Sequence, residues 1–346
     1  MKFKLHTTFE TLAPLAEPWN NLLNTSFINT PFLRYEYLSI WWETRGGGEW
    51  PAEATLAVIT AHDDEKLTGI APLFLTTNRD GQPVLMLLGS IEISDYLDLI
   101  VPLQDHESFV SGLMDWLESE ATGSIYPLLW KALDWYNLPE NSPTLSEIKT
   151  GAAKRNWDYV EEVYQPSPFI PLPGDFEIYL NGIDKKQRHE IRRKIRRAEE
   201  SGRGVRWYIV TDGTKLEAEM DEFITLMAHD PDKAAFLTEN MRLQMKKSAR
   251  AAFDIGCLQL AFLEVDGQKA CAYYNFDYDN KIWVYNSGLD RSFMELSVGW
   301  VLLGYLLEWA NNHKRTEFDF LRGDEDYKYK FGGQPRHVMR VKVSRP

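Results

Sequence analysis

The stretch from Lys281 to Gly333 decides the fold, and it reads KIWVYNSGLDRSFMELSVGWVLLGYLLEWANNHKRTEFDFLRGDEDYKYKFGG. A β-rich run ends near Ser287–Leu289, and a short loop follows it. The apolar spacing then predicts a helix from about Val298 to His313, and a second strand from Thr316 to Leu321. From spacing alone, this pattern also fits any βαβ unit that packs a helix on a sheet.

The predicted helix start is suited to an anionic ligand. Ser297 stands where an N-cap is expected. The amides of a first helical turn are unpaired, and the helix dipole favours negative charge in front of them. Gly299 in that turn lets a bulky group approach the backbone. The stretch carries no complete phosphate-loop signature of the type G-x-x-x-x-G-K-[ST].

Polar and aromatic residues crowd together directly after the second predicted strand. They are Arg322, Gly323, Asp324, Glu325, Asp326, Tyr327 and Lys328. These residue types can move protons and hold charged groups. The alternative is a charged surface turn, which the residues alone do not exclude.

The order GLD…ELSVGWVLLGYLLEWA…EFDFLRGDEDYKYKFGG resembles the C-terminal part of the BioF2-like/CelD-like acyltransferases. These proteins belong to the GNAT superfamily and are related to the Fem peptidyltransferases. The run D-F-L-R-G-D-x-x-Y-K-Y-K is the most specific part, and the resemblance extends over nearly the whole chain. It implies an α/β fold with mixed sheets, built as two tandem GNAT-like (acyl-CoA N-acyltransferase) domains.

Length and charge narrow the class of protein. A chain of 346 residues is long enough for two domains, each with its own core. The net charge is −13, and residues 1–165 hold 10 basic against 24 acidic residues. Such an acidic half argues against a general nucleic-acid binder.

The sequence does not predict a signal peptide, a transmembrane helix or a disulfide bond. The two cysteines, Cys257 and Cys271, flank a predicted hairpin turn in a register that does not bring them together. The first residues have no apolar core of a signal peptide, and no stretch holds eighteen uninterrupted apolar residues. We therefore expect a cytoplasmic protein without a transmembrane segment.

A proline-rich segment from Gln165 to Gly174 marks the expected domain boundary, because four prolines in ten residues favour an extended connector. The expected domains are 1–165, a degenerate GNAT-like half, and 166–346, the acyltransferase half. The first half repeats the coarse order of the second. Its predicted strands are 54–61, 67–76, 83–89 and 95–101, followed by a helix over 106–120 and a strand over 125–132.

Three residues of the first half are candidate substrate-binding residues. Asp95 and Asp98 fall in a strand-like run, where carboxylates are unusual, and the family has a similar SDYxD element. They either act on a substrate or hold a turn. Trp41 and its neighbour cannot both face one core stripe, so one of them borders a cleft or both simply pack.

The helix predicted over 184–202 is strongly basic. Asp184 is its expected N-cap, and eight of the thirteen residues from Lys185 to Arg197 are basic. This face, with Arg192 as a candidate substrate-binding residue, suits an anionic substrate, a coenzyme phosphate, an acidic membrane surface or RNA. The alternative is a solvated helix face.

The resemblance implies where an acyl donor binds. The coenzyme arm would follow the end of the fourth strand at Ser287 and Leu289, and the pyrophosphate would meet the loop and helix start. The residues of that second part are Leu296, Ser297, Val298 and Gly299. The superfamily pattern is Q/R-x-x-G-x-G/A, and here only the final glycine fits, so an activated donor other than acetyl-CoA stays open.

The resemblance also implies the catalytic groups. Tyr327 would protonate the departing thiolate, and Asp324 would hold or deprotonate the acceptor amine, with Tyr285 as a further candidate. Arg322, Glu325 and Lys328 are candidate substrate-binding residues. No metal is expected.

We therefore expect an N-acyltransferase that moves an acyl group, in the simplest case acetyl, from acyl-CoA to an amine held between the two halves. An amino sugar or another cell-envelope or polysaccharide precursor is the expected acceptor. Two alternatives remain: a Fem-like aminoacyl-tRNA-dependent peptidyltransferase, and a non-catalytic GNAT-derived binding protein. Contact of residues 185–197 with a membrane surface also stays open.

Overall fold

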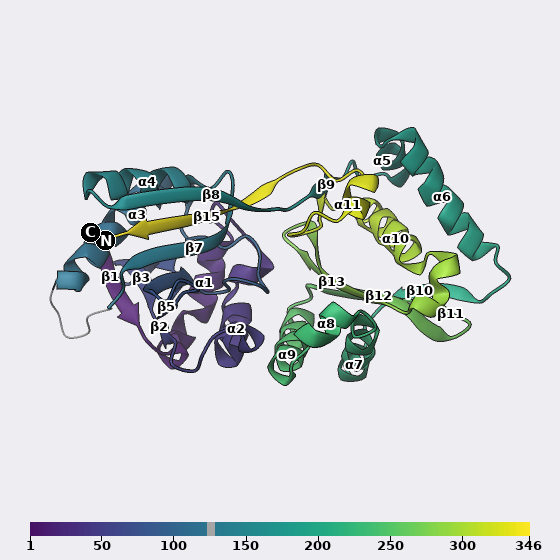
Figure 1. The fold of residues 1–346 in the computed structure, drawn as a ribbon, viewed down its shortest axis with the longest axis horizontal. Helices are drawn as coiled ribbons and strands as arrows, with labels where there is room; N and C mark the ends of the chain where they lie inside the picture. Colours follow the sequence, from purple (N-terminus) through teal and green to yellow (C-terminus); the bar gives the residue numbers. More distant parts are fainter. Residues whose placement is uncertain (123–128) are drawn as a thin grey trace. The chain divides into compact units, whose positions relative to one another are not determined.

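A computed structural model describes residues 1–122 and 129–346 (Figure 1). The chain forms two compact units. Unit 1 comprises Met1–Gln165 together with His337–Pro346, and unit 2 comprises Pro166–Arg336. No helix in the described ranges is long and apolar enough to cross a membrane.

Unit 2 is built on a six-stranded mixed sheet. In spatial order its strands are β10 (Val205–Ile209), β11 (Leu258–Val265), β12 (Gln268–Tyr278), β13 (Lys281–Leu289), β14 (Glu317–Asp319) and β9 (Phe169–Pro171). Neighbouring strands are antiparallel, except that β13 and β14 run parallel. Two hairpin turns connect β11 to β12 and β12 to β13, at Asp266-Gly267 and Asp279-Asn280, and all four residues have positive φ. The first is the turn predicted between Cys257 and Cys271.

Helices cover both faces of this sheet (Figure 1). They are α5 (Phe176–Gly182), α6 (Lys185–Glu199), α7 (Leu216–Met227), α8 (Pro231–Phe236), α9 (Glu239–Asp254), α10 (Val298–Asn312) and α11 (Asp326–Lys330). The apolar stripe of α10 is buried against the sheet, with Val301, Leu302 and Leu306 packed near Ile282 and Val284. The short 3-10 helix η5 (Arg291–Leu296) precedes α10.

Unit 1 has two sheets. A three-stranded sheet contains β1 (Lys2–His6), β3 (Val58–Asp63) and β4 (Lys66–Ala71). The second, in spatial order, contains β2 (Thr55–Leu56), β5 (Leu73–Thr77), β6 (Pro83–Leu87), β7 (Ala132–Pro139), β15 (His337–Ser344) and β8 (Asp158–Pro166). Its α-helices are α1 (Ala16–Leu23), α2 (Tyr35–Gly48), α3 (His106–Thr122) and α4 (Pro143–Lys154).

The two units share one layout. In unit 1, β5 and β6 are antiparallel, and β6 is parallel to β7, which follows it after α3. In unit 2, β12 and β13 are antiparallel, and β13 is parallel to β14, which follows it after α10. The predicted mixed α/β fold with two GNAT-like halves is therefore confirmed.

The structure differs from the expected domain limits at the C-terminus. We expected 337–346 to belong to the second half, but these residues lie in unit 1. The reason is strand pairing: β15 is antiparallel to β7 and lies between β7 and β8. The proline-rich connector is also more than a linker, because β9 pairs with β14.

One strand prediction in unit 1 was wrong, and a second lies partly outside the described residues. Residues 95–101 form a buried irregular segment with only isolated bridge pairing, at Ile100. The predicted strand 125–132 begins outside the described residues, and the observed strand β7 starts at Ala132. The run 95–101 resembles a strand in sequence because its apolar side chains are buried inside the unit, not because its backbone pairs in a sheet.

Truncation after Arg336 should unfold unit 1. The deletion removes β15 and its buried Val338, Val341 and Val343, each worth about 1.5–3 kcal/mol. A domain has only about 5–15 kcal/mol of stability in total. Limited proteolysis should then digest unit 1 faster than unit 2, whereas a chain ending at Ser344 should resist like the full chain. Equal resistance of the two truncations would contradict this role of β15.

Candidate active site

A β-bulge in β13 creates the central feature of unit 2. Tyr274 pairs with Asn286, but its neighbour Asn275 pairs with Val284, so Tyr285 is an extra residue in β13. The parallel partner β14 pairs only with Lys281–Trp283. In the described ranges, the remainder of β13 to Leu289 therefore has β12 on one side and no strand on the other.

The end of β14 explains this separation. The carboxylate of Asp319 accepts a hydrogen bond from the amide of Leu321 at 2.7 Å and pairs with Arg336. The amide of Phe320 donates to Pro168 at 3.0 Å, on the β9 side. The chain thus turns away from β13. We call the open edge of β13, residues 284–289, the slot, because its backbone polar groups can pair with an extended ligand.

The start of α10 closes one end of the slot. A Cβ placed on Gly299 would meet only Leu289 Cδ2, at 3.5 Å, so space remains over the first helical turn. Val298 and Leu296 are buried beneath it. Ser297 is not the predicted side-chain cap: its φ is 54°, and its Oγ accepts a hydrogen bond from Arg197 at 2.9 Å.

The basic helix α6 lies along α10 (Figure 1). The contact is close at Gly304, where a Cβ would lie 2.9 Å from Ile195 Cδ1. Asp184 caps α6 as predicted, accepting from the amides of Lys186 and Gln187. Arg192, the predicted substrate-binding residue, pairs with Glu177. Arg197 instead contacts Ser297 at the end of the slot next to α10, which we call the slot mouth. The sequence did not single out Arg197.

Lys233 in α8 is a second residue that the sequence did not indicate. Its Nζ donates to the Ser287 carbonyl at 2.6 Å and to Asn286 Oδ1 at 2.9 Å, at the slot itself. Burial lowers the pKa of this amine, while the charges of Asp230 and Glu325 oppose that shift. A single lysine in a six-residue helix has no distinguishing pattern, so only the fold could reveal it.

The turn after β14 is organised around Lys328. Its side chain is buried, and Nζ donates to the carbonyls of Leu321 at 3.3 Å, Arg322 at 2.8 Å and Gly323 at 3.1 Å. Glu325 pairs with it at 2.9 Å. An ammonium has three donors, so these contacts use them all. Lys328 therefore holds this turn together, and its predicted contact with substrate stays a prediction. Arg322 lies half-buried in the same turn.

Tyr327 and Asp324 lie in different surroundings. Tyr327 is half-buried in α11, and its ring packs edge-on against Phe320 at 5.9 Å. Burial, with a smaller effect of Glu325, raises the pKa of Tyr327, which keeps its hydroxyl protonated. Asp324 is exposed and accepts a hydrogen bond from Tyr329 Oη at 2.6 Å. That bond raises the pKa of Tyr329 to about 12.

Tyr285, the third predicted catalytic residue, is the bulge residue itself. Its ring packs against Tyr274, with centroids 5.1 Å apart, and against Phe276 at 5.4 Å. The structure thus brings Tyr285, Ser287, Leu289 and the start of α10 together in one unit.

The corresponding place in unit 1 is filled by the chain itself. Strand β6 pairs with β7 only at Val84 and Leu85. Beyond them, the amide of Leu97 donates to the Asn137 carbonyl at 2.9 Å, and Asn137 Nδ2 donates to the carbonyls of Ile91 and Ser94, both at 2.8 Å. Residues 90–101 thus occupy the space beside β7 where β6 and β7 separate. The corresponding space in unit 2, beside β14, is the open slot.

The predicted substrate residues of unit 1 lie in its interior. Asp98 is 1% exposed and accepts hydrogen bonds from Ser142 and Thr144, both at 2.5 Å, at the start of α4. Burial raises the pKa of Asp98. Trp41 is fully buried against Phe74, and Asp95 is buried in the filling segment. Of the alternatives, the structure favours packing for Trp41 and turn-holding for Asp98.

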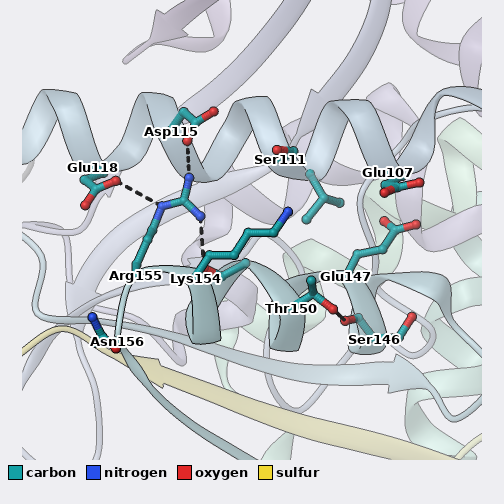
Figure 2. Close-up of a pocket in the computed structure, with 12 residues that line it drawn as sticks. Glu107, Ser111, Asp115, Glu118, Ser146, Glu147, Thr150, Lys154, Arg155 and Asn156 are labelled. Atoms are coloured by element: carbon teal, nitrogen blue, oxygen red, sulfur yellow. Dashed lines mark hydrogen bonds and ion pairs between the residues drawn. The ribbon is translucent and has the colours of Figure 1, made fainter.

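Unit 1 also has an open groove of about 640 Å³ between α3 and α4 (Figure 2). Its lining mixes hydroxyls, carboxylates and two cations, and Arg155 pairs with Asp115 and Glu118 across it. The groove carries none of the predicted site residues. Across residues 1–122 and 129–346, no cluster of His, Cys, Asp and Glu suits a metal ion.

Comparison with known proteins agrees with this geometry. Residues 185–329 match the family model described as an acetyltransferase (GNAT) domain, so this segment of unit 2 is a GNAT-type domain. The resemblance stated from the sequence is thereby confirmed. A comparison with curated protein sequences gives no match.

Solved structures show the fold over the whole chain. FemX superimposes with a TM-score of 0.60 at 12% identity, covering 98% of this chain and 97% of FemX. A conserved protein of unknown function from Bacteroides thetaiotaomicron gives 0.63 at 12%, covering 99% and 100%. L-PGS from Bacillus licheniformis gives 0.57 at 10%, covering 95% and 91%. At these identities the likeness concerns the fold alone.

Replacing Lys328 with methionine should destabilise unit 2 by about 3 kcal/mol, because three turn carbonyls lose a buried donor. Lys330→Met is the matched control. Lys330 is more exposed and pairs only with Asp326, so its loss should cost less than about 1 kcal/mol. Urea unfolding of both variants measures the difference. Equal stabilities would show that Lys328 does not hold the turn.

Proposed function

We propose that the protein is an N-acyltransferase that moves an acyl group, in the simplest case acetyl, from an acyl-CoA thioester to an amine in unit 2. The observation that carries this proposal is the slot: an open edge of β13, created by the bulge at Tyr285 and ending at the uncovered first turn of α10. A thioester arm with amide groups pairs with such an edge as an added strand does.

In this proposal the donor follows Ser287 to Leu289, and its pyrophosphate meets Leu296 to Gly299. Two observations support the fit. The space over Gly299 admits a group close to the helical amides. Arg197, held at Ser297, supplies a cation where the loop departs from the superfamily pattern. The mouth of the slot therefore offers charge and space for a phosphate.

The transfer step forms one bond and breaks another. The acceptor nitrogen attacks the thioester carbon, a C–N bond forms, the C–S bond breaks, and the thiolate leaves. Tyr327 is our candidate for the proton donor to the thiolate, because it lies in α11 shortly after β14 and its phenol carries a proton near neutral pH. Asp324, an exposed carboxylate, suits holding or deprotonating the amine. Tyr285 is the alternative acid.

The acceptor in this proposal is a small amine, such as an amino sugar or another precursor of the cell envelope or of a polysaccharide. The exposed carboxylate of Asp324 supports a cationic acceptor, since no cation pairs with it among the described residues. The net charge of −13 argues against a substrate that is attached to tRNA, because binding of nucleic acid depends on neutralising its phosphates.

Gly299→Glu should abolish donor binding. A carboxylate over the first turn of α10 fills the open space and repels the pyrophosphate, and the affinity for acetyl-CoA should fall at least about 100-fold. Calorimetric titration measures it. Gly299→Ala is the control, because its Cβ makes only an ordinary contact at 3.5 Å. An unchanged dissociation constant for Gly299→Glu would move the donor site elsewhere.

Tyr327→Phe should slow the chemical step about ten- to ten-thousand-fold without changing donor affinity, because it removes only the proton donor. Thiol release from acyl-CoA, measured in single turnovers with an amine identified by screening, gives the rate. Tyr329→Phe, which removes the exposed hydroxyl bonded to Asp324, should have a much smaller effect. Normal turnover of Tyr327→Phe would assign the acid to another residue.

A further inference from the structure

The outer face of α6 carries a concentration of positive charge on an otherwise acidic protein. Its exposed basic residues are Lys185, Lys186, Arg192, Arg193, Arg196 and Arg197. Of these, Lys185, Lys186 and Arg196 form no ion pair with any described residue. Packing on α10 does not require these cations, because Ile191, Ile195 and Ala198 make that contact. We call these six residues the α6 surface.

The α6 surface adjoins the mouth of the slot. Arg197, at one end of it, donates to Ser297 at the start of α10. The neighbouring Lys194 lies 3.6 Å from the ring centroid of Trp300 in the first turns of α10. Met294 in η5, just before Ser297, is 63% exposed. An exposed apolar side chain beside cations is typical of a surface that meets another protein.

The loop at the slot mouth offers a phosphate one cation, Arg197, and open space over Gly299, but it departs from the superfamily pattern for a pyrophosphate. In the run Met294–Gly299, only the final glycine fits the superfamily pattern. Glu295 places a carboxylate there, which pairs with Arg203 at 3.0 Å. The loop thus has space and a cation for one phosphate, beside a slot whose open edge suits a thioester arm.

We propose that the α6 surface docks an acidic acyl carrier protein, whose acyl-phosphopantetheine arm enters the slot as a donor alongside free acyl-CoA. This inference rests on the proposed acyltransferase function. A carrier-bound arm has a single phosphodiester in place of the pyrophosphate, and the carrier's own acidic surface replaces the adenosine handle. Charge complementarity then supplies both orientation and association rate.

The pattern of charges favours a protein partner over nucleic acid or a membrane. Acidic residues are interspersed with the cations: Glu177 pairs with Arg192, and Glu190 pairs with Arg193. Nucleic-acid binding depends on neutralising many phosphates, which such acids oppose. A membrane-binding helix needs exposed apolar residues on its outer face, whereas Ile191 and Ala198 of α6 are buried.

The chemistry is that of the proposed function with a different leaving group. The acceptor amine attacks the carrier-bound thioester carbon, the C–N bond forms and the C–S bond breaks. The leaving thiol is the carrier's phosphopantetheine thiol, which takes the proton that the amine loses. No oxidant or further reactant is needed.

The test compares two triple variants of the full chain with equal change in charge. Lys185→Glu, Lys186→Glu and Arg196→Glu reverse three unpaired cations of the α6 surface. The control is Lys131→Glu, Lys149→Glu and Lys154→Glu, three exposed lysines of unit 1. The probes are fluorescently labelled acyl carrier protein loaded with acetyl (acetyl carrier protein), acetyl-CoA and a bulk tRNA, each titrated at two salt concentrations. Thiol release is measured for the two thioesters.

We expect the α6 variant to bind acetyl carrier protein about tenfold more weakly or worse, with a reduced salt dependence. Its affinity for acetyl-CoA should change less than about twofold, because Arg197 is retained. The control should behave like the unmodified protein. Carrier binding that survives in the α6 variant, or falls equally in both variants, would overturn the inference.

Other outcomes separate this inference from the proposed function. Acetyl-CoA binding and turnover without carrier binding would overturn the docking surface and leave the acyltransferase standing. Binding of neither thioester would overturn both. Binding of tRNA that depends on the α6 surface, without carrier binding, would assign that surface to nucleic acid instead.

Discussion

The structure of unit 2 depends on one constraint: β13 continues past the point where its parallel partner β14 turns away. The extra residue Tyr285 and the Asp319 carboxylate at the end of β14 together open the edge of β13. The free end is fixed from the other side. A Cβ on Gly288 would lie 2.4 Å from the Met227 amide nitrogen of α7, so only glycine permits this contact, and Lys233 ties Ser287 to α8.

Unit 1 shows what happens when the same layout keeps its slot closed. The parallel pair β6–β7 also separates after two residues, but residues 90–101 fill the space and hydrogen-bond to Asn137. The apolar side chains of that segment, Ile91, Leu97 and Ile100 among them, belong to the core. Two copies of one architecture thus differ in whether their slot is available to a ligand: within residues 1–122 and 129–346, the open strand edge beside an open helix start lies in unit 2.

The sequence predicted α10, the hairpins and the capped helix α6, because their signals are local: apolar spacing, turn residues and an N-cap aspartate. It did not predict β15 in unit 1, since strand pairing between residues some 200 positions apart leaves no local trace. For the same reason it missed Lys233 and Arg197, and it did not indicate that Lys328 binds the carbonyls of its own turn. The donor-site predictions at Ser287 and Leu289 come from the family resemblance, whereas Gly299 was also indicated by its place in the first turn of a predicted helix.

Hydrogen–deuterium exchange with and without acetyl-CoA tests the central claim most directly. Saturating acetyl-CoA should protect backbone amides within 284–299 and leave 88–101 and 132–139 unchanged, because the slot of unit 2 is open whereas residues 90–101 fill the corresponding space in unit 1. Protection of 88–101 and 132–139, or binding of acetyl-CoA without protection of 284–299, would contradict the assignment of the donor site to unit 2.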